Sequence, residues 1–114
     1  MRRPSSRKAL PTVITKDELE ARLVLGHDLQ ILNVADARHH DLGMIAGSLK
    51  IPYAELSVRA ALELVKSREV VTYGSDSACD RSRMAAELLM KKGYKASWYD
   101  GGIREWTAAG LPVD

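Results

Sequence analysis

Short apolar runs alternate with amphipathic segments along this chain of 114 residues, and that alternation restricts the folds it can adopt. Runs of strand length lie at residues 29–35, 69–73 and 94–100, with a smaller one ending before Pro52. Segments with helical spacing lie at residues 15–26, 54–65 and 82–92, and a short one follows the glycine pair at 101–102. Strands and helices that alternate at this spacing predict an α/β fold, with a parallel sheet covered by helices on both faces.

The helix boundaries carry their own signals. Thr15 stands three residues before Glu18, which is the spacing of a capping box. Gly26 and Gly93 follow the helical segments and can end them in a left-handed conformation. In the segment 82–92, apolar residues recur at i, i+4, so one face is expected to pack on the core.

Length and composition fit one soluble domain. The sequence is 46% hydrophobic and 28% charged, and no apolar run approaches the ~20 residues of a membrane span. The basic start has no apolar block behind it, so a secretory signal is not expected. A single cysteine cannot form an internal disulfide. We therefore expect a reducing, cytoplasmic location and no membrane association.

The net charge of +2 is unevenly distributed. Residues 1–8 hold four basic residues and no acid, so the remainder has 13 basic and 15 acidic residues and is slightly acidic. Such a body lacks the basic face that a nucleic-acid-binding protein needs. We expect residues 1–11 to be a solvated leader and residues 12–114 to form the domain. The leader could instead contact an anionic partner or belong to a transit peptide.

The stretch VVTYGSDSACDRSRMAAELL, residues 70–89, predicts a strand, a tight loop and a helix. Backbone N–H groups in such a loop point toward one place, and the helix dipole there favours anions. Arg81 could close over the same place, and Asp80 or Ser82 could cap the helix. The residues expected to bind an anionic substrate are Ser75, Asp76, Ser77, Ala78, Asp80, Arg81 and Ser82.

Cys79 lies just before the predicted helix. A thiol so placed can have a pKa lowered to ~3.5–7.5, and the thiolate suits sulfur or phosphoryl transfer. Asp76 and Asp80 oppose both a dianion and a thiolate. The alternatives are that Cys79 fills space beneath the loop and that Arg81 is a surface arginine paired with Asp76 or Asp80.

Other motifs exclude several site types. His39 and His40 are adjacent and project in different directions, so no metal site is expected from them. The chain has neither a dinucleotide-binding Gly-x-Gly-x-x-Gly nor a Gly-x-Ser-x-Gly elbow. Trp98 and Trp106 are interpreted as core residues. No metal and no organic cofactor is expected.

Four stretches resemble the rhodanese family of sulfurtransferases: ITKDELEARL, ILNVADARHHDLGMIAGSLKIP, DRSRMAAELL and GYKASWYDGGIREWTAAGLPV. The last is the most specific, with a glycine pair followed by Trp106, Gly110 and Pro112. The resemblance implies a small α/β domain with a mostly parallel five-stranded sheet. It also implies transfer of sulfane sulfur, from thiosulfate or a protein persulfide to a thiophilic acceptor, through a cysteine persulfide in the loop.

The chain departs from the family pattern where the chemistry would sit. The usual nucleophilic cysteine directly follows the strand, where this chain has Gly74, and six rather than four residues then precede Arg81. Some family members have this longer loop with a second cysteine at the position of Cys79. A usual Asp-Val-Arg is Asn33-Val34-Ala35 here, and a usual Gly-His-Ile is Gly43-Met44-Ile45.

Two interpretations of Gly74 remain. In the first, the nucleophile is Cys79, and Gly74 lets the backbone turn tightly. In the second, the domain is a catalytically inactive module whose loop binds an anion or a protein partner. Moving a nucleophile five residues along a small loop weighs against the first interpretation, because even ~1 Å of misplacement can cost about 10²-fold in rate.

Overall fold

A computed structural model describes residues 11–35, 43–78 and 80–114. In chain order its elements are β1 (Thr12–Ile14), α1 (Lys16–Val24), β2 (Leu29–Asn33), β3 (Leu49–Lys50), α2 (Tyr53–Glu63), β4 (Glu69–Tyr73), α3 (Arg81–Lys91), β5 (Ala96–Tyr99) and α4 (Gly102–Ala108). The five strands form one sheet in the order β1-β5-β4-β2-β3, and every neighbouring pair is parallel. The predicted α/β fold is confirmed. Of the expected leader, residues 1–10 lie outside the described residues.

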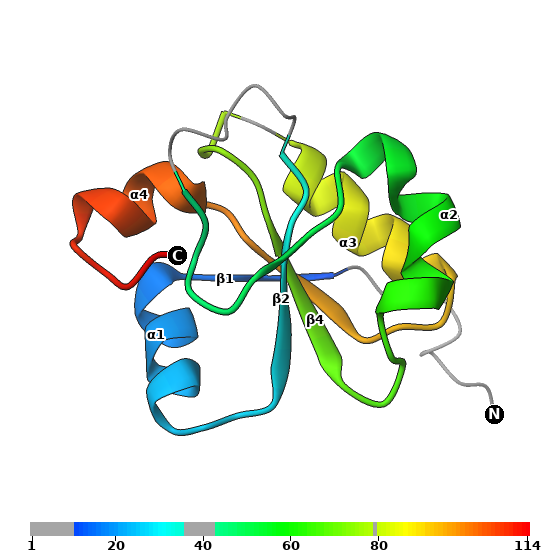
Figure 1. Cartoon of the computed structure of the whole chain (residues 1–114), viewed down its shortest axis with the longest axis horizontal. Helices are drawn as coiled ribbons and strands as arrows, with labels where there is room; N and C mark the ends of the chain where they lie inside the picture. The colour runs from blue at the N-terminus through cyan, green and yellow to red at the C-terminus, as the bar shows by residue number, and fades with distance from the viewer. Residues whose placement is uncertain (1–10, 36–42, 79) are drawn as a thin grey trace, which may run out of the picture.

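The helices form two layers, with α1 and α4 on one face of the sheet and α2 and α3 on the other (Figure 1). Side chains of the central strand β4 alternate between them, as the pleat requires. Val70 joins the core cluster with the buried residues of α2 and α3. Val71 and Tyr73 join the cluster with those of α1 and α4. One strand therefore contributes to both halves of the core.

The predicted boundaries of the first helix are confirmed. The Glu18 N–H donates to Thr15 Oγ1 at 3.1 Å, and the Thr15 N–H donates to Glu18 Oε1 at 2.8 Å. Gly26 and Gly93 have φ of 79° and 96°, the left-handed conformation that ends a helix. Helix α3 runs from Arg81, one residue earlier than expected.

Trp106 is a core residue, as predicted, since it is 2% exposed. Its indole N–H donates to the Pro112 carbonyl at 2.8 Å, and its ring meets Tyr99 edge-on with centroids 6.0 Å apart. Trp98 is half-buried against the cluster of the α2 and α3 face.

A polar cluster joins helix α1 to strands β4 and β5 at Glu69, the first residue of β4. The guanidinium of Arg22 on α1 donates to both carboxylate oxygens of Glu69, at 2.7 and 3.3 Å. The Ser97 hydroxyl on β5 donates to the same carboxylate at 2.9 Å. The Arg22 guanidinium holds the pKa of Glu69 below its ordinary value. Three elements are thereby joined by one carboxylate.

Within the described part of the chain, no helix is both long and apolar enough to cross a membrane.

Candidate functional site

The loop of residues 74–80 leaves β4 at the carboxyl edge of the sheet and leads into α3. Strand β4 is the middle strand of five, with β5 on one side and β2 on the other. Ligands of α/β sheets bind beyond the carboxyl ends of the strands. The structure thus places the loop singled out by the sequence at the edge where a site is expected.

The first turn of α4 anchors the start of this loop. The Ile103 N–H donates to the Gly74 carbonyl at 3.0 Å, and the Arg104 N–H donates to the Ser75 carbonyl at 2.9 Å. Gly74 and Ser75 are both buried. These contacts fix the backbone at Gly74, where the resemblance noted in the sequence leads one to expect a nucleophile.

Gly102 allows this close approach. Its φ is +72°, and a β-carbon there would stand 2.7 Å from both the Gly74 carbonyl oxygen and the Asp76 nitrogen. Gly74 is not among the described glycines with positive φ. The turn expected at Gly74 therefore does not depend on the conformational freedom of glycine, and L-residues can adopt that backbone.

The two acidic side chains of the loop face different groups. Asp76 Oδ1 accepts a hydrogen bond from the Ala78 N–H at 3.0 Å, and its Oδ2 accepts from Arg104 Nε at 3.2 Å. The Asp80 side chain is 68% exposed, with Arg83 Nη2 3.8 Å from its carboxylate. Asp76 thus forms an ion pair with Arg104, a residue that sequence reasoning missed because it lies 28 positions away, on helix α4.

The expected capping of α3 is not formed. Asp80 holds the N-cap position, but its side chain makes no capping hydrogen bond. Ser82 lies inside the helix and is buried, and its backbone carbonyl accepts a hydrogen bond from the Thr72 hydroxyl at 2.6 Å. Ser82 therefore joins α3 to β4 instead of capping the helix.

The remaining predicted site residues are distributed around the same loop. Ser77 and Ala78 are exposed, and Arg81 is half-buried at the start of α3. The Ala78 N–H, one of the donors expected for an anion, already donates to Asp76. Cys79 lies outside the described residues, as do His39 and His40.

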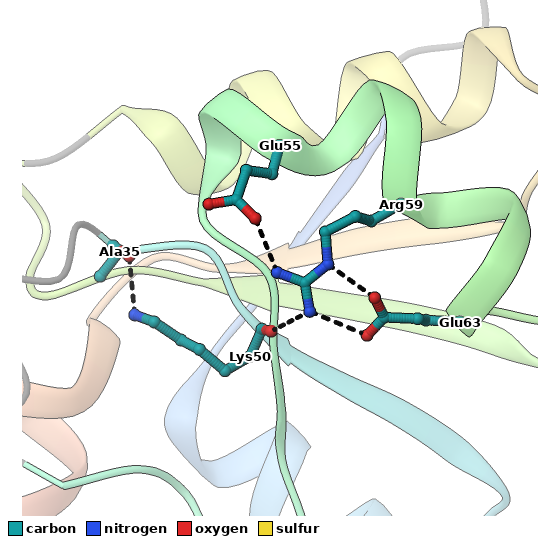
Figure 2. Close-up of polar contacts among 5 residues, drawn as sticks. All are labelled: Ala35, Lys50, Glu55, Arg59 and Glu63. Atoms are coloured by element: carbon teal, nitrogen blue, oxygen red, sulfur yellow. Dashed lines mark hydrogen bonds and ion pairs between the residues drawn. The ribbon is translucent and has the colours of Figure 1, made fainter.

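Beside the loop, the end of β2 is held by an amide and an ammonium group. Asn33 is 3% exposed, and its Oδ1 accepts from the Ala35 N–H at 2.9 Å and from Lys50 Nζ at 3.1 Å. Lys50 Nζ also donates to the Ala35 carbonyl at 2.7 Å, and the Lys50 carbonyl accepts from Arg59 of α2 (Figure 2). The amide that replaces the usual acid thus organises a turn of the backbone.

The last residue of β4, the buried Tyr73, makes hydrogen bonds at the same edge of the sheet. The Tyr73 hydroxyl accepts the Ile45 N–H at 3.0 Å and lies 2.8 Å from Ser48 Oγ. Burial raises the pKa of Tyr73, so its phenol is neutral at physiological pH. It connects β4 to the segment before β3.

Two concave surfaces flank the loop, and Asp76 borders both. One has a volume of about 640 Å³ and lies on the α3 side, between Tyr53, Arg81 and Met84. The other has a volume of about 690 Å³ and lies between the loop, α4 and the ends of β1 and β5. Among the described residues, no group of three or more His, Cys, Asp or Glu could hold a metal ion. The arrangement suits a small molecule bound against the loop.

Solved structures with the same fold include two named as rhodanese proteins. The rhodanese-like domain of the Alr3790 protein from Anabaena sp. is 30% identical, with a TM-score of 0.78, and the match covers 93% of this chain and 80% of that one. A rhodanese-related protein from Thermoplasma volcanium is 25% identical, with a TM-score of 0.78, and the match covers 90% and 97% of the two chains.

A curated relative and a family profile complete the comparison. The HTH-type transcriptional regulator Rv0324 of Mycobacterium tuberculosis is 35% identical over 101 residues, which are 89% of this chain. The chain spans only 44% of that regulator's length. The rhodanese-like domain profile matches residues 15–109, from the N-cap of α1 to the C-cap of α4. Because this profile matches most of the chain, including all four helices, the chain belongs to the rhodanese-like domain family.

Proposed function

We propose that this domain is a sulfurtransferase that takes up sulfane sulfur on Cys79 and passes it to a thiophilic acceptor. The observation that carries the proposal is the engagement of Asp76 by Arg104 and by the Ala78 N–H. From the sequence alone, the negative charge of Asp76 is expected to disfavour both a bound anion and a thiolate at Cys79. The pairing of Asp76 with a cation reduces this repulsion in the loop that the family uses for its chemistry.

The transfer has two steps, and neither step needs an external oxidant or reductant. The Cys79 thiolate attacks the outer sulfur of thiosulfate, the S–S bond of thiosulfate breaks, and sulfite leaves with the bonding pair. The product is a Cys79 persulfide. A thiolate or cyanide then attacks the terminal sulfur, takes it as a persulfide or as thiocyanate, and releases the Cys79 thiolate. A protein persulfide can replace thiosulfate as donor.

The loop backbone and Arg81 have supporting roles in this proposal. N–H groups between Ser75 and Asp80, other than that of Ala78, are the donors for the anion, and Arg81 adds a positive charge at the start of α3. A reducing compartment such as the cytoplasm would keep Cys79 as a thiol.

A second candidate function is a catalytically inactive module that binds an anion or a protein partner at the same loop. Two observations favour it. The usual nucleophile position holds Gly74, which has no side chain, and its backbone is anchored by Ile103. The chain is also similar to part of a protein named as a transcriptional regulator.

Intact mass after incubation with thiosulfate separates the two functions. The chain and its Cys79→Ser variant are treated in parallel. The sulfurtransferase gains the mass of one sulfur atom, loses it on addition of cyanide, and shows no gain in the variant. Alkylation of Cys79 against pH gives an independent check, with a thiol pKa well below about 8.5 expected for the enzyme. Absence of any adduct, with an ordinary thiol pKa, favours the inactive module.

A further inference from the structure

An apolar cavity of about 300 Å³ lies between α1, α4 and the C-terminal segment, and we call it the α1 cavity. The C-terminal segment runs back from α4 toward α1 (Figure 1), so Pro112 lines the cavity together with Trp106. The other walls come from the second half of α1 and from Ile45 and Ala46, which precede β3. None of its described lining residues belongs to the loop of residues 74–80, so the cavity is separate from the candidate site.

Hydrogen bonds hold the walls of the α1 cavity in place. The Pro112 carbonyl accepts from the Trp106 indole N–H at 2.8 Å and from the Ala46 N–H at 3.1 Å. The next residue, Val113, forms a β-bridge with Ile45. Because the single donor of the indole is used in this way, the Trp106 ring presents apolar atoms to the cavity. The cavity is thus preformed, since its walls are tied to one another.

Glu20 is the one charged residue among the described residues that line the cavity. It is half-buried, and within the described parts of the chain its carboxylate forms no hydrogen bond or ion pair. The two cations of α1 are engaged elsewhere, because Lys16 Nζ donates to Asp17 at 2.7 Å and Arg22 pairs with Glu69. The carboxylate at the cavity is therefore available to a further cation.

Apolar surface continues beyond the cavity. Val24, which lines it, is 79% exposed, and Leu25, beside Val24 in the chain, is 72% exposed. Val113, next to Pro112, is 45% exposed. A small molecule that filled the cavity would leave these side chains in water, whereas a protein surface would cover them. Their exposure favours a polypeptide as the occupant.

From these features we infer that the α1 cavity is a docking site for another protein, which inserts one aromatic or large aliphatic side chain and places a Lys or Arg side chain beside Glu20. An anchor side chain in a pocket, surrounded by contacts that exclude water, is where protein interfaces concentrate their binding energy. The charge of Glu20 favours a basic neighbour for this anchor. The inference goes beyond the proposed function, because it needs neither Cys79 nor the loop.

A second copy of this chain fits the cavity less well. Leu62 on α2 is the most exposed of the described large hydrophobic residues, at 81%. Arg59 on the same helix donates to both Glu55 and Glu63 (Figure 2), so α2 carries a formal charge of −1. Docking through this helix would bring carboxylates toward Glu20, and the cation of α2 is already paired. A partner with an uncommitted cation is the better match.

Docking is tested with a blocked peptide and the full chain. The probe is acetyl-Leu-Ala-Phe-Lys-Ala-Leu-amide, in which Phe is the anchor, Lys is the cation and the leucines meet the exposed rim. The readout is the indole N–H signals of the two tryptophans in a ¹H–¹⁵N spectrum. The Trp106 signal should move with a Kd of about 1 mM or tighter, because Trp106 lines the cavity. The Trp98 signal should stay, because Trp98 packs on the α2 and α3 face.

Two related peptides identify what the cavity recognises. Replacing Phe by Ala removes the anchor and should weaken binding at least about tenfold. Replacing Lys by Glu reverses the charge beside Glu20 and should weaken binding about fivefold, the effect expected when an exposed ion pair becomes a repulsion.

Two variants of the chain locate these contacts. Glu20→Gln should bring the Kd values of the Lys and Glu peptides to within about twofold of each other. Ala46→Phe should weaken the Lys peptide at least about tenfold, because Ala46 is exposed at the cavity and the new ring takes the place of the anchor. Ala61→Phe is the matched control, since Ala61 is an exposed alanine on α2, and it should change none of the affinities. A dispersed amide spectrum shows that each variant is folded.

The outcomes separate this inference from the proposed function. Binding that depends on both the anchor and the charge supports docking, whatever thiosulfate does to Cys79. An adduct on Cys79 without peptide binding overturns the docking site and leaves the sulfurtransferase standing.

Other results would assign the cavity differently and would also overturn the inference. Equal losses in Ala46→Phe and Ala61→Phe would place the peptide elsewhere on the surface. Binding of 2-phenylethylamine as tight as that of the peptide would make the cavity a small-molecule site. Self-association of the chain that Ala46→Phe abolishes would identify a second copy as the occupant.

Discussion

Gly102 lies directly against Gly74, because a β-carbon on Gly102 would stand 2.7 Å from the Gly74 carbonyl oxygen. Gly102→Ala should lower the free energy of unfolding by about 2 kcal/mol or more, since it adds a clash to an unfavourable φ. Gly26 has a similar φ of +79° with nothing within 4 Å, so Gly26→Ala should lose only about 1 kcal/mol. Urea unfolding measures both, and equal losses would show that the contact is unimportant.

Tyr73→Phe should destabilise the fold by about 1–2 kcal/mol. The change removes the buried oxygen that accepts the Ile45 N–H and leaves this donor unsatisfied. Tyr94→Phe is the control, because Tyr94 is also buried but its hydroxyl makes no hydrogen bond within the described residues. Denaturant midpoints of the two variants should differ clearly. A loss as large in Tyr94→Phe would contradict the explanation.

Glu69 should stabilise the fold in a pH-dependent way. Arg22 lowers the pKa of Glu69 from its ordinary value of 4.5, so the folded state holds the proton less tightly than the unfolded state does. Its contribution is present above about pH 4.5 and is lost as pH falls through the lowered pKa. Glu69→Gln should therefore be destabilised by about 1 kcal/mol at neutral pH. The difference from the parent chain should shrink in acid.

Thermal unfolding of the parent, Glu69→Gln and Arg22→Met between pH 3 and 7 checks this pair. Both variants should lose the same acid-dependent part of the stability, because each removes one partner of the same contact. A constant difference across this range would mean that Glu69 acts through packing alone.

Gly74→Cys should introduce sulfurtransferase activity at the usual position of the family. The Ile103 N–H holds the carbonyl of residue 74, and the backbone there lacks the positive φ that would exclude a side chain. We expect the rate of thiocyanate formation from thiosulfate and cyanide to rise about 100-fold over the parent, as ordinary nucleophile placement is restored. Gly74→Ser, made in parallel, should show no increase. The Gly74→Cys, Cys79→Ser double variant tells whether the new thiol works alone.

Much of the fold follows from local signals in the sequence. The capping box of Thr15 and Glu18 and the helix-ending Gly26 act within a few residues of one another, so the sequence displays them directly. The apolar run of β4 likewise predicts a strand buried on both faces. Strand β1 gives a weaker signal, because it has three residues and only Ile14 of them is buried.

The site was less predictable because its key contacts join distant positions. Nothing near Asp76 in the sequence indicates that Arg104 will pair with it, since the pair forms only when α4 packs against the loop. Ser82 does not form the cap that its sequence position suggests, for a related reason. Its sequence position fits a cap, but the helix starts one residue earlier and Thr72 binds its carbonyl.

The pairing of the first strand with the last has a consequence for synthesis of the chain. Thr12 of β1 pairs with Ser97 of β5, and β5 is the only neighbour of β1 among the described strands, because β1 lies at the edge of the sheet. During translation, β1 is made first but has no partner until β5 has left the ribosome. Closing so long a segment costs chain entropy that only the complete sheet repays. The nascent domain therefore keeps an unpaired strand until almost its last residues are made, and a chaperone has that whole interval in which to bind it.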